Sequence, residues 1–189
     1  MDFADIRRLV IVSIFSDDEL LERLVLKGGN AISLVYGLGS RTSLDIDCSI
    51  DGDFDLVEEA SARLERALQR RFEEAGCRVF DFRFEKRPSR DRADAPETWG
   101  GYTASFKIVS LAQFETLKND LEGMRRNSLK IGPGQERVFS IDMSKHEYCA
   151  PKREKELQDF TIYVYSLAMI ALEKLRAICQ QMDELLLAT

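Results

Sequence analysis

The chain has 189 residues, of which 44% are hydrophobic and 32% charged, and its formal net charge at pH 7 is −6. This composition is typical of a globular domain with a sizeable core, and it excludes the disordered and fibrous classes. No apolar stretch approaches the roughly 20 residues that a membrane-spanning helix needs, so we expect no membrane partner. The negative charge also argues against non-specific binding of nucleic acid over the whole surface.

The cysteine pattern bears on disulfide bonds and metal binding. The four of them lie far apart in the sequence without a CxxC pair, and His146 is the single histidine. Neither a disulfide framework nor a zinc site is indicated, and reduced thiols favour a cytoplasmic location.

The first part of the chain is predicted to be mainly helical. A helix is expected over residues 2–15, and Ser16 with Glu19 forms a capping-box pattern that opens a second, short helix. A pair of glycines then precedes a helical stretch over residues 30–36.

Residues 44–50 alternate between apolar and polar side chains, which predicts a half-buried strand. The apolar positions are Leu44, Ile46, Cys48 and Ile50, and the polar ones are Asp45, Asp47 and Ser49. Residues 55–75 have apolar side chains at helical spacing, so we expect a long amphipathic helix packed on the sheet.

The rest of the chain adds strands and a final helix. Strands are expected over residues 78–84, 102–109, 137–144 and 160–165. Ser110 with Gln113 is a capping pattern for a helical segment, and residues 166–187 form a largely apolar helix. This order predicts an α/β (α+β) fold, in which a mixed sheet with packed helices is followed by a C-terminal helix.

A basic cluster lies in and before the charged loop that separates strands 78–84 and 102–109. It comprises Arg83, Lys86, Arg87, Arg90 and Arg92. The cluster is either a solvated loop or a local RNA-binding patch, and the sequence leaves both interpretations open.

Three aspartates are candidates for a metal site. Asp45 and Asp47 are two apart on a strand, so their side chains leave the same face. Asp142 occupies the polar phase of strand 137–144, and three carboxylates on adjacent strands repel one another unless a cation neutralises them. Two-metal sites for phosphoryl transfer use such oxygens for Mg²⁺ or Mn²⁺, although a pair of strand aspartates also occurs as a plain solvated face.

Gly28 and Gly29 directly precede a predicted helix. Backbone N–H groups at a helix start can approach a triphosphate closely where side chains are absent, and an ordinary tight turn is the alternative. The neighbouring Lys27 either joins this site or is a solvated flank.

The order and spacing of these motifs resemble the first signature of the AbiEii/AbiGii nucleotidyltransferase toxins, in the DNA polymerase beta-like superfamily. The residues that carry the resemblance are Lys27-Gly28-Gly29-Asn30-Ala31, Tyr36-Gly37-Leu38, Arg41, Ser43 and Asp45-Ile46-Asp47. Residues 138–144 resemble the family's strand with a third acidic residue. Residues 172–177 resemble its helix motif, in which a lysine reaches the nucleotide phosphates.

The resemblance implies a role for each of these residues. Asp45, Asp47 and Asp142 would hold Mg²⁺ (or Mn²⁺), and Lys174 would contact the triphosphate as a further catalytic residue. The implied nucleotide-binding set is Lys27, Gly28, Gly29, Asn30, Arg41, Ser43 and Lys174. Asn30 departs from the family, which usually has Ser or Thr there. On the residues alone, Lys174 either extends to solvent or meets an anion, and Arg41 and Ser43 either contact nucleotide or form a turn.

The implied function is metal-dependent transfer of a nucleotide from a nucleoside triphosphate (NTP) to an acceptor such as tRNA. The protein would be the toxin of a bacterial type IV toxin–antitoxin or phage-defence system, with a cognate antitoxin. We expect a nucleotidyltransferase core over residues 1–165 and the start of a helical region over residues 166–189, shorter than in the family. A protein or small-molecule acceptor, or a non-catalytic binding role, remains an alternative.

Overall fold

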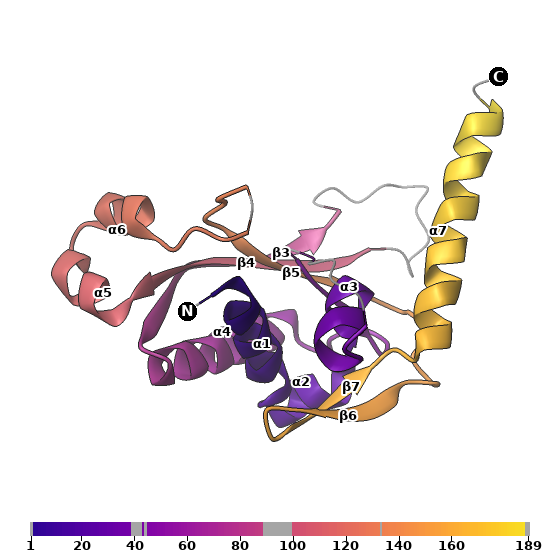
Figure 1. Cartoon of the computed structure of the whole chain (residues 1–189), viewed down its shortest axis with the longest axis horizontal. Helices are drawn as coiled ribbons and strands as arrows, with labels where there is room; N and C mark the ends of the chain where they lie inside the picture. The colour runs from indigo at the N-terminus through magenta and orange to yellow at the C-terminus, as the bar shows by residue number, and fades with distance from the viewer. Residues whose placement is uncertain (1, 39–42, 44, 89–99, 133, 188–189) are drawn as a thin grey trace.

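The computed structural model describes residues 2–38, 43, 45–88, 100–132 and 134–187, with side chains described as far as residue 179. The strands are β1 (Leu24–Lys27), β2 (Ile46–Ile50), β3 (Cys77–Arg87), β4 (Gly101–Ser110), β5 (Phe139–Ser144), β6 (Arg153–Leu157) and β7 (Phe160–Val164). Within the described residues they form one mixed sheet of seven strands in the order β3-β4-β5-β2-β1-β7-β6 (Figure 1).

The helices surround this sheet unevenly. They are α1 (Phe3–Phe15), α2 (Asp18–Arg23), α3 (Gly28–Asn30), the π-helix η1 (Ala31–Val35), α4 (Val57–Glu74), α5 (Leu111–Leu117), α6 (Leu121–Asn127) and α7 (Leu167–Leu187). Helices α1 and α4 lie side by side against one face of the sheet, whereas α7 projects from the opposite end of the molecule to α5 and α6 (Figure 1). In the part of the chain that the structure describes, no helix has both the length and the apolar character to cross a membrane.

The core forms where the apolar phase of the strands meets α1 and α4. Its largest fully buried side chains include Phe72, Phe106, Phe139, Ile46, Ile50, Leu64 and Leu68. Burial of each side chain of this size contributes about 1.5–3 kcal/mol to the free energy of folding, relative to leaving it exposed. The predicted α/β fold, with its mixed sheet, packed helices and C-terminal helix, is confirmed.

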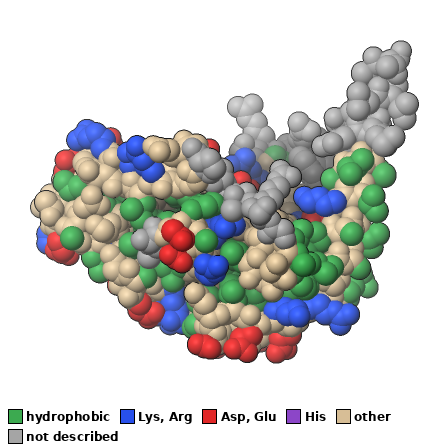
Figure 2. All heavy atoms as spheres, in the orientation of Figure 1, with side chains coloured by type: hydrophobic (Ala, Val, Ile, Leu, Met, Phe, Trp, Pro, Cys, Tyr) green, Lys and Arg blue, Asp and Glu red, His purple; other side chains and the backbone are tan. Residues whose placement is uncertain are grey.

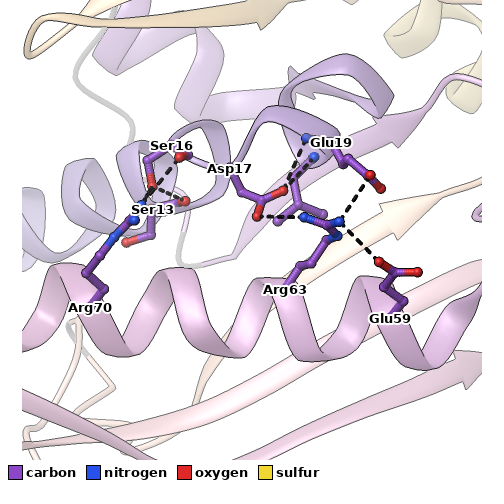
Figure 3. A network of polar contacts seen from close by, with 8 residues as sticks. Ser13, Ser16, Asp17, Glu19, Glu59, Arg63 and Arg70 are labelled. Atoms are coloured by element: carbon purple, nitrogen blue, oxygen red, sulfur yellow. Dashed lines mark hydrogen bonds and ion pairs between the residues drawn. The ribbon is translucent and has the colours of Figure 1, made fainter.

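Polar contacts fix α4 to the first two helices (Figure 3). Arg63 bonds to Asp17, Glu19 and Glu59, and Arg70 bonds to the hydroxyl of Ser16. The contacts to Ser16, Asp17 and Glu19 link α4 to the junction of α1 and α2.

The predicted capping box at Ser16 is wrong. Asp17 caps α2, because its carboxylate accepts the backbone N–H groups of Glu19 and Leu20. Ser16 instead ends α1 and donates its hydroxyl to the carbonyl oxygen of Ser13 at 2.9 Å.

Other elements differ from prediction in their number and length. Strands β1 and β6 were not predicted as strands, and β3 is longer than expected. Ser110 does cap α5, but the helical segment is divided, and Asp120 caps α6 separately.

Helix α7 begins at Leu167, close to the expected boundary, while the division into two domains stays a prediction. The predicted basic residues Arg90 and Arg92 lie outside the described residues.

Candidate functional site

A row of polar residues crosses the sheet face opposite the α1 and α4 side. Lys27 on β1 pairs in register with Asp47 on β2, Asp47 with Asp142 on the parallel β5, and Asp142 with Thr103 on β4. Residues directly opposite on neighbouring strands share a face, with Cα atoms about 4.5–5.5 Å apart in antiparallel pairs. The predicted adjacency of the Asp47 and Asp142 strands is therefore confirmed, but the expected grouping of Asp45, Asp47 and Asp142 within reach of shared metal ions is not found among the described residues. We call Lys27, Asp47, Asp142 and Thr103 the polar row.

Asp47 is the most perturbed carboxyl of the row. Burial raises its pKa to about 6, and the charges of Asp142 and Asp45 act in the same direction. Lys27 and Lys174 oppose this rise. Among the described residues, no side-chain hydrogen bond is donated to the Asp47 carboxylate, and Lys27 and Lys174 act on it through their charge.

The other two aspartates are held by hydroxyl groups. The Thr103 hydroxyl donates to Asp142 Oδ1 at 2.6 Å, and the Ser140 hydroxyl donates to Asp45 Oδ1. Asp45 immediately precedes β2 and is exposed. Within the described part of the chain, no three His, Cys, Asp or Glu side chains are grouped to hold a metal ion. The aspartates are thus aligned along the sheet without forming a ready-made metal centre.

The glycine pair lies against these carboxylates. Gly28 has φ +68°, and a Cβ placed on it would lie 2.4 Å from Asp47 Oδ2, so only glycine fits without displacing Asp47. A Cβ on Gly29 would lie 3.2 Å from that of Ser43. Of the residues predicted from the sequence to bind nucleotide, Gly28 therefore adjoins Asp47, and Ser43 adjoins the neighbouring Gly29. Arg41 lies outside the described residues.

Asn30 does not face this site. Its side chain is fully buried, where Nδ2 donates to the backbone oxygen of Asp45 at 2.7 Å and Oδ1 accepts from Arg7 Nη1 at 2.9 Å. These bonds engage the oxygen and one of the two N–H groups of the amide, and the predicted contact of Asn30 with phosphate stays a prediction. Asn30 instead fixes the backbone from which the Asp45 carboxylate extends.

Lys27 is buried, so the interpretation as a solvated flank is also wrong. Its ammonium donates to Glu147 Oε2 at 2.6 Å, Glu173 Oε1 at 3.0 Å and Ser144 Oγ at 3.2 Å. These three acceptors match the three N–H donors of an ammonium group. Burial opposes its charge, but the two glutamates outweigh burial and raise the pKa of Lys27. In this arrangement, Lys27 has no N–H left for a phosphate.

Lys174 is exposed on α7. Its charge acts on Asp47 and lowers the pKa of that carboxyl, which places α7 within electrostatic reach of the polar row. The predicted contact of Lys174 with a triphosphate stays a prediction.

An open cleft of about 1800 Å³ adjoins the row on its Asp142 and Thr103 side. Strands β3, β4 and β5, the segment that follows β5 and one side of α7 form its walls. Its charged and aromatic lining residues are Glu85, Lys86, Arg87, Tyr102, Asp142, Lys145, His146, Glu147, Tyr148, Tyr165, Glu173 and Arg176. Binding pockets for small ligands occupy about 300–1000 Å³, so this cleft has room for a larger molecule.

Sequence reasoning missed Glu147, Glu173, Ser49 and Tyr165. The hydroxyls of Ser49 and Tyr165 both donate to Glu147 Oε2, the latter at 3.0 Å, and burial raises the pKa of Tyr165. Two of them could have been found from the sequence. Ser49 is two residues after Asp47 on the predicted strand and so shares its face, and Glu173 directly precedes Lys174. Glu147 lies in a segment without periodicity and carried no such signal.

The mixed sheet, its helices and the terminal α7 are consistent with the nucleotidyltransferase fold, and the aspartates of β2 and β5 occupy its centre. The class of protein that this fold fits is therefore that of nucleotidyltransferases. Residues 10–185 match the family described as "Nucleotidyl transferase AbiEii toxin, Type IV TA system", and the chain belongs to this family. Membership implies a nucleotidyltransferase toxin of a type IV toxin–antitoxin system, with a cognate antitoxin. No curated protein matches the chain significantly.

Proposed function

We propose that the chain is a metal-dependent toxin that transfers a nucleotide from an NTP to an RNA acceptor, with tRNA as the expected one, in the cytoplasm and in defence against phage. The observation that carries this proposal is the register pairing of Asp47 with Asp142 on parallel strands, with Asp45 two residues before Asp47. Family membership supplies the reaction class.

The three aspartates fit a divalent cation chemically. Their oxygens are hard ligands of the kind that Mg²⁺ and Mn²⁺ prefer. Burial, Asp142 and Asp45 disfavour ionisation of Asp47, and Lys27 and Lys174 compensate this only in part. A bound cation would supply that compensation, lower the pKa of the acceptor hydroxyl and stabilise the leaving pyrophosphate. The hydrogen bonds from Ser140 and Thr103 would orient Asp45 and Asp142 as ligands.

The nucleotide would occupy the Gly28 side of the row. Gly28 is buried against Asp47, whereas Gly29 is only partly buried, and the absence of a side chain at Gly29 would let phosphate oxygens approach its backbone. Ser43 and Arg41 would contact the nucleotide from the segment before β2. Lys174 would balance phosphate charge from α7, in keeping with its electrostatic effect at Asp47.

The acceptor would occupy the large cleft. The attacking hydroxyl oxygen forms a bond to the α-phosphorus while the bond to pyrophosphate breaks, and Asp142, which lines the cleft, takes the hydroxyl proton. Lys86, Arg87 and Lys145 contribute basic groups to the walls, and Tyr148 is 75% exposed. Phosphate contacts by basic side chains and stacking on aromatic rings are how proteins hold single-stranded RNA ends.

The test is transfer of label from each α-labelled NTP, with Mg²⁺, to purified tRNA, total protein extract or small metabolites. We expect label on tRNA, and its loss in the Asp45→Asn/Asp47→Asn variant. Asp159→Asn is a matched control, because Asp159 is exposed in the turn between β6 and β7. Label on protein or metabolites would refute the RNA acceptor, and no labelling of any acceptor would refute the enzymatic proposal.

A further inference from the structure

A buried charge cluster joins α7 to the sheet beside the polar row. Lys27 bridges Glu147, which follows β5, and Glu173, which belongs to α7. The side chains are 8%, 16% and 21% exposed, respectively. We call Lys27, Glu147 and Glu173 the clasp.

Further groups compensate the charge of Glu147 in the clasp. Arg176, one turn beyond Glu173, lies 3.5 Å from Glu147 Oε1, and the hydroxyls of Ser49 and Tyr165 donate to Glu147 Oε2. Burial opposes the charge of Glu147, but Lys27 and these hydroxyls lower its pKa overall. With Arg176 included, two cations face two carboxylates, so the cluster is neutral when every member is ionised.

Among the described side chains of α7, those beyond its first turn are mostly exposed. Ile170 is buried, but Leu172, Leu175 and Ile178 are 65%, 57% and 54% exposed. Figure 1 shows the helix projecting from the sheet, and Figure 2 shows hydrophobic side chains along its exposed length. Because the described apolar side chains of this stretch are exposed, the clasp and the Arg176–Glu147 ion pair are its main ties to the sheet among the described residues.

The clasp also sets the position of Lys174, which directly follows Glu173 on α7. Glu173 is bonded to Lys27, Lys27 is the register partner of Asp47, and Lys174 acts electrostatically on Asp47. Buried ion pairs seldom stabilise a fold more than apolar residues of similar size, and their better-supported use is to fix one arrangement among several. A clasp at this point restricts where the Lys174 ammonium can reach.

We propose that Glu173 is a positioning residue, which holds α7 through Lys27 so that Lys174 reaches the nucleotide site at Asp47. This inference rests on the proposed function, because it takes Lys174 as a triphosphate contact. Glu173 itself touches no substrate in this scheme, and its effect passes through Lys174.

The first test follows α7 directly and needs no enzymatic activity. Cys179 on α7 is exposed, whereas Cys48, Cys77 and Cys149 are buried, so a spin label attaches selectively to Cys179. Glu173→Ala is expected to increase label mobility, and Glu173→Gln, whose amide oxygen still accepts from Lys27, to restore most of the parent spectrum. Glu154→Gln on the exposed face of β6 is the matched control. Unchanged mobility in folded Glu173→Ala would overturn the clasp.

The second test measures coupling to Lys174. Glu173→Ala is expected to raise the KM for NTP about tenfold or more in the parent, and to have no further effect in a Lys174→Ala background. Equal losses in both backgrounds would show that Glu173 does not act through Lys174. If Glu173→Ala does not fold, the same comparison is made with Glu173→Gln. Its smaller rise in KM for NTP must then be absent in the Lys174→Ala background. A parent that transfers no nucleotide refutes the proposed function alone, because the mobility test still decides whether the clasp holds α7.

Discussion

The carboxylate of Asp47 lies directly against the backbone of Gly28. A Cβ at position 28 would fall 2.4 Å from Asp47 Oδ2 and 3.1 Å from its Cγ, and Gly28 has φ +68°. The glycine is thus required twice, once by its own backbone conformation and once by the side chain of the neighbouring strand. This second requirement links the glycine turn to the aspartate at the centre of the polar row.

Gly28→Ala is expected to cost about 1–3 kcal/mol of stability from the strained backbone, and to displace Asp47 in addition. Gly76→Ala is the matched control, since Gly76 has φ +75° but no atom within 4 Å of the position that a Cβ would take. Thermal unfolding of both variants and their transfer rates separate the two effects. We expect similar losses of stability but a loss of transfer only in Gly28→Ala, and equal activities would contradict the close approach to Asp47.

Asn30→Ala is expected to destabilise the fold by about 2–4 kcal/mol, because the Asp45 carbonyl and the Arg7 guanidinium each lose a buried partner. Denaturant unfolding measures this loss. Asn30→Asp keeps an acceptor for Arg7 but removes the donor to Asp45, and is expected to lie between the parent and Asn30→Ala. A variant of unchanged stability whose KM for NTP is raised would instead make Asn30 a phosphate ligand.

The aspartates of the site were predictable from the sequence for a physical reason. The side-chain period of a strand is two residues, so alternation around Asp47 and Asp142 assigned both to the polar face. Alternation does not give the order of strands, however. The parallel pairing of β2 with β5, which puts these two residues in register, depends on contacts between segments about 95 residues apart in sequence, as in the bond between Ser140 and Asp45.

Lys27 and Asn30 show what local reasoning could not supply. Both adjoin the glycine pair and match a phosphate-binding pattern, but their surroundings come from distant parts of the chain. Glu147 and Glu173, 120 and 146 residues away, engage Lys27, and Arg7 engages Asn30. A buried lysine needs such carboxylates to stay charged, but the sequence does not name them.

Asp81 makes the stability of the α6 side of the molecule dependent on pH. Its carboxylate accepts from Arg125 at 2.6 and 2.8 Å and from Lys107 at 3.0 Å, and these bonds lower its pKa to about 2. A carboxyl whose pKa is lowered on folding stabilises the protein above the pKa of the unfolded chain, near 3.8, and loses this contribution as the pH falls towards 2.

Asp81→Asn is therefore expected to cost about 2 kcal/mol at pH 7 and almost nothing at pH 2, in proportion to the shift of its pKa. Unfolding free energies of parent and variant across this range measure the difference. Asp159→Asn is a close control, because Asp81 and Asp159 have similar φ values of 52° and 66°. A difference that stays constant with pH would exclude ionisation of Asp81 as its origin.

The Asp45→Asn/Asp47→Asn variant tests the centre of the site. Folding without metal is expected to be unharmed or improved at pH 7, because a carboxyl whose pKa is raised on folding, here from 3.8 to about 6, costs stability once it ionises. The amide of residue 47 removes this cost. Transfer is expected to fall at least ~10³-fold, since metal stabilisation of phosphoryl charge contributes several kcal/mol.

The same variant separates a catalytic pair from a structural one. Thermal unfolding with and without NTP and Mg²⁺ should show stabilisation of the parent, since ligand that binds only the native state stabilises it, and none of the variant. If the variant unfolds without ligand, the two carboxylates serve the fold. If it folds, transfers nucleotide at the parent rate and still arrests growth in cells, Asp45 and Asp47 do not hold the catalytic metal.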